Sequence, residues 1–271
     1  MPEERRIYAV IFDTHCHFDD ERFDEDREEA WQRMLDNNVK HCVCVGSDLH
    51  SSRRCLAFAN AHPGAFAACG VHPHEAEKAE KDYLTQLRQM LVQEKCVALG
   101  EIGLDYYYDF SPRDVQKRVM AEQVDLALEM DMPVIFHIRD AHGEMIDFFR
   151  SRKKLPRGII HCFSGSAETA LEYVRMGFYI SFAGPVTFKN AQNLQRAAEA
   201  VPAERLLCET DSPYLSPVPM RGKRNEPAHV RFVNQKLAEL KGLSEEEMAR
   251  ITCQNAFEIY TKAGRNVKFL E

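Results

Sequence analysis

Short apolar runs alternate with longer amphipathic stretches along the whole chain. Eight of the runs have the length of a strand and the composition of a buried one. We predict strands at Tyr8–Asp13, His41–Gly46, Ala65–Val71, Val97–Gly100, Val134–His137, Gly158–Cys162, Phe178–Phe182 and Leu206–Glu209. Amphipathic patterning predicts helices near residues 24–38, 50–61, 80–94, 113–131, 142–152, 166–176, 190–200, 227–241 and 244–261.

The regular alternation of strand and helix indicates βαβ units and a parallel sheet. Eight such units in about 250 residues fit a closed (β/α)₈ barrel of the TIM type, an α/β fold. A doubly wound open sheet is the alternative, although such a sheet rarely needs eight regular units. No Gly/Ser-rich or Pro-rich linker divides the chain, so we expect residues 1–271 to form a single barrel domain. The last helix should begin after Ser244, because acidic residues after a Ser cap suit a helix N-terminus.

The composition narrows the class of protein. Hydrophobic residues make up 45% of the 271 residues, which is enough to bury the large core of one barrel. The apolar run Tyr8–Phe12 is too short for a signal peptide, and no run approaches the ~20 apolar residues of a membrane span, so we expect no membrane partner. The net charge of −7 argues against a broad basic face that coats nucleic acid. Any contact with nucleic acid should therefore be local.

The nine cysteines indicate a reducing compartment. They are odd in number, are scattered without a CxxC pair, and stand mostly inside strand-like runs. Cys42 and Cys44 are two residues apart, so they should share one face of their strand. We expect buried free thiols in a cytoplasmic enzyme.

Polar residues of metal-ligand type stand at the ends of five predicted strands. They are His15, His17, Glu101, His137, His161 and Asp211. Taken singly, each has an ordinary structural explanation: a hydrogen-bonded histidine, a helix cap at Glu101, or an Asx turn at Asp211. Because the carboxyl ends of barrel strands meet at one mouth, the six should instead converge there. The presence of all six at one end of the barrel predicts a metal site.

The number of predicted ligands suggests two cations rather than one. Six side chains exceed the four ligands of a tetrahedral ion, and a carboxylate, here Glu101, can bridge two ions. Histidine and carboxylate ligands suit Zn²⁺, Mn²⁺, Fe or Ni, and Mg²⁺ is an alternative where carboxylates, water and phosphate complete the shell. Two divalent ions bring four positive charges, of which Glu101 and Asp211 cancel two. Such a site stays electropositive and favours a phosphate substrate.

Several motifs resemble those of the TatD family of metal-dependent deoxyribonucleases, in the same order and over nearly the whole chain. They are Phe12-Asp13-Thr14-His15-Cys16-His17, Gly70-Val71-His72-Pro73-His74, Gly100-Glu101-Ile102-Gly103-Leu104-Asp105-Tyr106-Tyr107, His137-Ile138-Arg139-Asp140-Ala141, Ile160-His161-Cys162-Phe163-Ser164-Gly165, Glu209-Thr210-Asp211-Ser212-Pro213-Tyr214-Leu215, Arg221-Gly222-Lys223-Arg224-Asn225-Glu226-Pro227 and Asn255-Ala256-Phe257. Met120 and Tyr260 depart from the family pattern, and both departures concern packing.

The resemblance implies a metallo-dependent hydrolase barrel that cleaves phosphodiester bonds of DNA, with exonuclease action as the expected mode and RNA as an alternative substrate. It also implies two divalent cations, Mg²⁺, Mn²⁺ or Zn²⁺. By the same resemblance, His15, His17, Glu101 and Asp211 surround one cation, and Glu101, His137 and His161 the other. Asp211 would also be the catalytic general base, accepting a proton from water whose pKa a metal lowers from 15.7 to about 7.

Candidate substrate contacts are expected around this site. Arg221, Lys223 and Arg224 lie in the long loop after the last strand, where barrels often bind phosphate, although a solvated charge cluster is the alternative. Arg139 follows the fifth strand and either contacts substrate or forms a salt bridge. For His72 a structural role competes with substrate contact, whereas His74 is expected outside the site. The tyrosines at 106–108 either stack on a base or pack.

Two other functions compete with a nuclease. One is a barrel hydrolase with the same metal cage that acts on a lactone, an amide or a deaminated base. The other is a non-catalytic metal-bound scaffold, which the extra carboxylate of Asp211 makes less attractive. The sequence gives no sign of an obligate protein partner.

Overall fold

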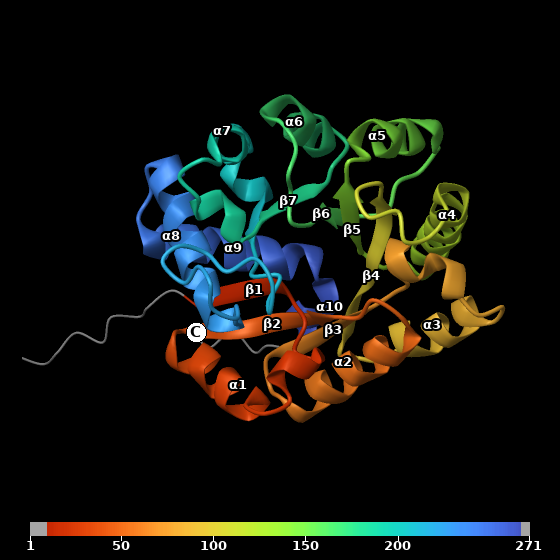
Figure 1. Ribbon diagram of the computed structural model, residues 1–271, viewed down its shortest axis with the longest axis horizontal. Coiled ribbons are helices and arrows are strands. Elements are labelled where there is room, and N and C mark those ends of the chain that lie inside the picture. The colour runs from red at the N-terminus through yellow and green to blue at the C-terminus, as the bar shows by residue number, and fades with distance from the viewer. Residues whose placement is uncertain (1–9, 267–271) are drawn as a thin grey trace, which may run out of the picture.

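Eight parallel strands form a (β/α)₈ barrel in the computed structural model, which describes residues 10–266, with side chains through 264. Figure 1 shows the helices arranged around the strands. The strands follow one another around the sheet in sequence order. Their bounds are β1 Ile11–Cys16, β2 Val39–Val45, β3 Ala65–Cys69, β4 Cys96–Asp105, β5 Val134–Arg139, β6 Gly158–Ile160, β7 Tyr179–Phe182 and β8 Leu206–Cys208. The predicted fold class is confirmed.

Each predicted helix has a counterpart in the structure. The α-helices are α1 Arg27–Asp36, α2 Leu49–Ala61, α3 Tyr83–Leu91, α4 Arg113–Met130, α5 His142–Ser151, α6 Ala167–Arg175, α7 Gln192–Ala200, α8 Val230–Lys241, α9 Glu245–Ile259 and α10 Thr261–Asn266. Short 3₁₀ helices precede or follow several of them, at η1 Glu21–Phe23, η2 Pro73–Lys78, η3 Gly184–Thr187, η4 Ala203–Arg205 and η5 Pro227–His229. Ser244 caps α9 as predicted, because its side chain accepts a hydrogen bond from the N–H of Glu247. Within the described residues, no helix has the length and apolar character needed to cross a membrane.

Two apolar layers follow from the alternation of side chains along the strands. Val43 and Val45 of β2 point into the barrel, where they pack with Phe12, Phe66, Val97, Ala98, Ile135, Ile159, Tyr179 and Leu207. Cys42 and Cys44 belong to the outer layer, between the strands and the helices. The expectation that these two cysteines share a face is therefore confirmed.

The main boundary error concerns β4, which we predicted to end at Gly100. The strand continues to Asp105 and pairs with β5 as far as Arg139, so that Glu101 lies within the strand rather than after it. Gly103 interrupts the apolar pattern because the backbones approach closely there: its φ is +147°, and an added Cβ would lie 1.9 Å from the carbonyl oxygen of His137. The start of the first predicted strand, Tyr8 and Ala9, lies outside the described residues.

The barrel closes between β1 and the segment that follows β8. The N–H of Asp211 donates to the carbonyl of His15 at 2.9 Å, and the N–H of His17 donates to the carbonyl of Ser212 at 2.8 Å. Cys16 and Ser212 form the isolated parallel bridge between these bonds. This seam brings two distant parts of the chain together at the carboxyl end of β1.

The C-terminal helices contribute side chains to the inner apolar cluster. Phe257 and Tyr260 pack on Phe12, with ring centroids 5.3 and 6.0 Å away. The buried hydroxyl of Tyr260 donates to the carbonyl of Thr14 at 3.0 Å. The end of α9 therefore supports β1 directly below the seam.

We expect Tyr260→Ala to lower the free energy of unfolding by about 3–5 kcal/mol, because it removes a fully buried aromatic ring. Tyr260→Phe keeps the ring and should cost about 1–3 kcal/mol through the unpaired Thr14 carbonyl. Urea denaturation followed by circular dichroism measures both. Equal stability of the two variants would mean that the ring contributes nothing beyond its hydroxyl.

Candidate metal centre

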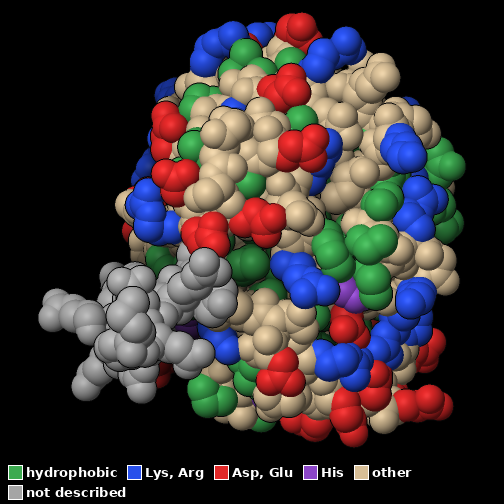
Figure 2. Space-filling view, turned by 90° about the vertical axis from the view of Figure 1, so that its left-hand side faces the viewer, with side chains coloured by type: hydrophobic (Ala, Val, Ile, Leu, Met, Phe, Trp, Pro, Cys, Tyr) green, Lys and Arg blue, Asp and Glu red, His purple; other side chains and the backbone are tan. Residues whose placement is uncertain are grey.

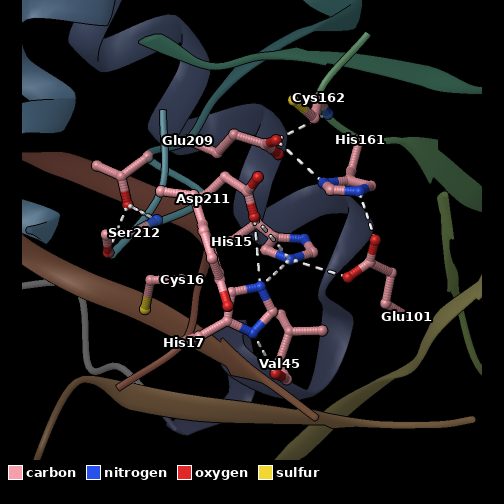
Figure 3. A network of polar contacts seen from close by, with 12 residues as sticks. His15, Cys16, His17, Val45, Glu101, His161, Cys162, Glu209, Asp211 and Ser212 are labelled. Atoms are coloured by element: carbon pink, nitrogen blue, oxygen red, sulfur yellow. Dashed lines mark hydrogen bonds and ion pairs between the residues drawn. The ribbon is translucent and has the colours of Figure 1, made fainter. Parts of the chain in front are cut away.

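The six side chains predicted as metal ligands converge at the carboxyl ends of the strands. Four of them form a first group (Figure 3). His17 Nε2 lies 3.2 Å from His15 Nε2 and 3.3 Å from Asp211 Oδ1. His15 Nε2 lies 3.4 Å from Glu101 Oε2. A backbone turn produces this approach, since Asp211 has a φ of +55°, a region that few residues other than glycine adopt.

The second group shares Glu101 with the first. Glu101 Oε1 lies 2.6 Å from His161 Nε2 and 2.7 Å from His137 Nδ1, and these two nitrogens are 3.4 Å apart. The two oxygens of Glu101 thus face different groups of imidazoles. This arrangement is what a carboxylate that bridges two cations requires.

Hydrogen bonds behind the site fix how the imidazoles face it. His17 Nδ1 donates to the carbonyl of Val45 at 2.8 Å, and His161 Nδ1 donates to Glu209 Oε1 at 3.1 Å. Each bond fixes the tautomer and turns the Nε2 lone pair toward the other ligand candidates. Lone pairs and carboxylate oxygens that face one another need a cation between them, so the donor set fits divalent metal ions.

The buried charges of the site compensate one another. Burial alone would raise the pKa of Glu101, but the charge on the His161 imidazole and hydrogen bonds from His137 and His15 hold it well below its usual range. Burial works against protonation of His17, yet the hydrogen bond with Asp211 raises the pKa of His17 to about 9. In the absence of metal, the carboxylates are therefore balanced by protons on neighbouring imidazoles. A metal ion has to displace these protons, because only an unprotonated nitrogen can be a ligand.

Two carboxylates that sequence reasoning did not single out hold the ligand candidates in place. Glu209 is fully buried, and it accepts hydrogen bonds from His161 Nδ1 and from the N–H of Cys162 at 2.7 Å. Asp105 is also fully buried, and its Oδ2 accepts from His137 Nε2 at 2.9 Å. Sequence spacing offers a hint for both, since Asp105 stands four residues after Glu101 within β4, and Glu209 follows β8 directly, two residues before Asp211.

His72 is neutral and presents a donor to the site. Burial lowers the pKa of His72 to about 4, and its Nδ1 accepts a hydrogen bond from the N–H of His74 at 3.1 Å. The single ring proton therefore resides on Nε2, which lies 3.4 Å from Glu101 Oε1. In this tautomer His72 offers an N–H to the site rather than a lone pair for a metal.

We expected His74 outside the site, and the structure places it directly behind a ligand candidate. His74 Nε2 donates to Asp105 Oδ2 at 2.9 Å, the same oxygen that accepts from His137. Its ring also lies against His72, with centroids 4.3 Å apart. His74 reaches this position because η2 begins right after His72 and turns the chain back toward β4.

The three basic side chains that we predicted to contact substrate after β8 differ in their surroundings. Arg224 is engaged by the protein itself: it donates to both oxygens of Asp26, at 2.6 and 2.8 Å, and lies over the ring of Phe23. Arg221 and Lys223 are exposed, with Arg221 over the ring of Phe188. Only these two remain available to a ligand in the loop after β8.

Arg139 does not form the predicted salt bridge. Its guanidinium lies over the rings of Tyr107 and Tyr108, 4.1 and 4.8 Å from their centroids. No carboxylate among the described residues lies within 4.0 Å of it. Glu144, in the helix α5 that follows, pairs with Lys117.

The chain matches known proteins over nearly its full length. The family model described as TatD related DNase matches residues 12–261. An uncharacterized metal-dependent hydrolase of Bacillus subtilis (strain 168), YabD, is 42% identical over 93% of this chain and 99% of its own length. The protein named 3'-5' ssDNA/RNA exonuclease TatD from Cronobacter sakazakii is 32% identical, over 93% of this chain and 98% of its own. The crystal structure of YjjV, a TatD homologue of Escherichia coli K12, superposes with a TM-score of 0.88 at 33% identity, covering 93% of this chain and 98% of that one.

We expect Glu209→Gln to weaken divalent-metal binding by roughly 10- to 100-fold, because a neutral amide oxygen accepts the Nδ1–H of His161 more weakly than a carboxylate and makes its Nε2 a poorer ligand. Calorimetric titration of the metal-free protein measures the affinity. Glu258→Gln is a matched control, since Glu258 pairs with Tyr179 away from the candidate ligands. Equal metal affinities of the Glu209→Gln protein and the wild type would contradict this role.

Proposed function

The chain belongs to the TatD family of metal-dependent hydrolases, and on that premise we propose that it hydrolyses phosphodiester bonds of DNA, with RNA as an alternative substrate. We further propose two divalent cations, Mg²⁺, Mn²⁺ or Zn²⁺, as its cofactors. One observation carries the proposal: the carboxylate of Glu101 lies between two groups of metal-ligand side chains that come from four other strand ends.

In this proposal His15, His17, Glu101 and Asp211 hold one cation, and Glu101, His137 and His161 hold the other. When bound, the cations supply Lewis-acid chemistry, which acidifies water and offsets charge on a phosphate. Asp211 accepts the proton of the attacking water, because its Oδ1 faces the first group, 3.3 Å from His17 Nε2 and 3.7 Å from His15 Nε2. His72 Nε2–H donates a hydrogen bond to a phosphate oxygen.

Phosphate is favoured over a neutral substrate by the cationic groups around the site. Arg139 lacks a carboxylate partner within the described part of the chain, and Arg221 and Lys223 are exposed in the loop after β8. A neutral lactone or amide would form no ion pair with these cationic side chains. The Cronobacter relative named as a single-strand exonuclease also supports nucleic acid as the substrate class and end-wise cleavage as the mode.

We place this activity in the cytoplasm. All nine cysteines are free, and seven of them are buried. Thiols that persist in this state suit a reducing compartment.

The proposed function is tested with metal-reconstituted protein and end-labelled single-stranded and double-stranded DNA. Asp211→Asn should fold normally but turn over roughly 10²–10⁴-fold more slowly, because an amide cannot accept the proton. Product lengths and initial rates are measured on a gel. Laddering from one end would identify an exonuclease, and internal fragments an endonuclease.

Asp125→Asn is the matched control, since Asp125 is an exposed carboxylate of α4 that pairs with Arg152 outside the candidate metal centre. Its rate should equal that of the wild type. Near-native turnover of the Asp211→Asn protein at saturating metal would assign the base to another group. A wild-type protein that leaves DNA intact but hydrolyses a lactone or amide would overturn the proposed substrate.

Neutralising Arg221 and Lys223 together should weaken DNA binding and flatten its salt dependence. Each lost phosphate contact should remove roughly 0.7–0.9 from the log–log slope, according to strand type. Arg224→Met should instead lower thermal stability, because it leaves Asp26 without a bidentate partner. Fluorescence anisotropy at several salt concentrations and thermal melts separate the two effects. An unchanged salt slope in the double variant would exclude this loop from substrate binding.

A further inference from the structure

Three exposed aromatic side chains form a contiguous surface just after β4. Tyr107, Tyr108 and Phe110 are 59%, 47% and 64% exposed, and we call this group the aromatic rim. Tyr108 stacks on Phe110 with centroids 5.1 Å apart and ring planes at 19°, and Tyr107 meets Tyr108 edge-on at 4.9 Å. The rim holds three of the seven large exposed hydrophobic side chains of the described residues. Scattered exposed rings are ordinary, but a cluster of them indicates a binding surface.

The rim is attached to the candidate metal centre through one buried carboxylate. Asp105 Oδ1 accepts the N–H groups of Tyr107 and Tyr108, at 3.0 and 2.8 Å. Its other oxygen accepts from His137 Nε2 and from His74 Nε2. The ring of His74 in turn meets Phe110 edge-on at 4.9 Å. The position of the rim is thereby fixed relative to a proposed metal ligand.

The rim also carries a positive charge. The guanidinium of Arg139 lies over Tyr107 and Tyr108, and no carboxylate of the described residues pairs with it. Figure 2 shows one side of the molecule, where hydrophobic, Lys and Arg, and acidic side chains surround a histidine. Aromatic faces combined with an unpaired cation suit a ligand that has both a flat ring and a phosphate.

We propose that the aromatic rim stacks an unpaired nucleobase next to the phosphate to be cleaved, while Arg139 binds a flanking phosphate. This inference rests on the proposed function, because it assumes a polynucleotide substrate. Every base has a face that can stack on an aromatic ring, so the rim selects an unpaired strand without reading its sequence. A base within a duplex is stacked and paired already, and freeing it costs energy. The rim therefore makes single strands the preferred substrate.

Binding is measured separately from hydrolysis. The probe is a short oligothymidylate that carries one 2-aminopurine and phosphorothioate linkages, which slow hydrolysis, added to the metal-loaded enzyme. Stacking on the rim should quench the 2-aminopurine fluorescence. Replacing Tyr108 and Phe110 by Ala should abolish the quench and weaken binding roughly 5- to 150-fold.

Three comparison variants make the test specific. Phe110→Tyr keeps an aromatic face and should retain the quench, whereas the double variant Tyr108→Leu, Phe110→Leu keeps apolar area without those faces and should lose it. Val92→Ala removes a side chain of similar exposure, 66%, at the end of α3 and next to the amino end of β4, so it should leave binding unchanged. Equal behaviour of the double Leu variant and wild type would mean that the rim offers only apolar area, and would overturn base stacking.

Cleavage of unmodified DNA distinguishes the two proposals. The ratio of single-strand to duplex cleavage rates should fall in the double Ala variant and persist in Val92→Ala. A wild type that quenches and binds the probe but cleaves no DNA overturns the nuclease proposal and supports the rim. A wild type that cleaves single strands with no loss of rate, binding or quench in the double Ala variant overturns the rim and supports the nuclease. A wild type that neither binds nor quenches the probe overturns the rim.

Discussion

A buried, ionised carboxylate at the centre of the barrel mouth is the constraint around which the site is built. Glu101 is only 4% exposed, and a charge buried to this degree is tolerated only with compensating partners. Its partners are imidazoles of His15, His72, His137 and His161. They come from different strand ends, so the closed barrel is what brings them within reach of one side chain.

Further buried carboxylates lie behind the imidazoles that contact Glu101. Two of the imidazoles that face Glu101 direct their second nitrogen to a buried carboxylate: His161 to Glu209 and His137 to Asp105. Asp13 lies deeper still and accepts from the N–H and hydroxyl of Thr210, next to Asp211. Burial raises the pKa of Asp13 well above its usual value. The site is thus a cluster of buried polar groups inside an apolar barrel. The buried carboxylates orient the imidazoles, and the imidazoles orient Glu101.

The sequence predicted the elements well because fully buried strands and amphipathic helices have distinct patterns. The prediction was wrong at the end of β4. In the sequence Gly103 interrupts the apolar pattern, but in the structure its backbone packs against β5 and the strand continues. Candidate ligands were identifiable because the barrel fold turns strand ends into neighbours. The roles of Glu209, Asp105 and Arg224 were not, because each depends on a partner distant in sequence: His161, His137 and Asp26. Residue type and position reveal a ligand candidate, whereas pairwise contacts appear only after folding.

The seam between β1 and the segment after β8 has a consequence for how the protein is made. During synthesis His15 and His17 leave the ribosome long before Asp211, which lies more than two-thirds of the way along the chain. Joining segments so distant in sequence closes a long loop, which makes this contact entropically costly and late in folding. Nascent chains and truncated products that end before Asp211 hold every other proposed ligand yet lack the proposed base. Under the role proposed for Asp211, a chain becomes competent for hydrolysis only once the segment after β8 has been made.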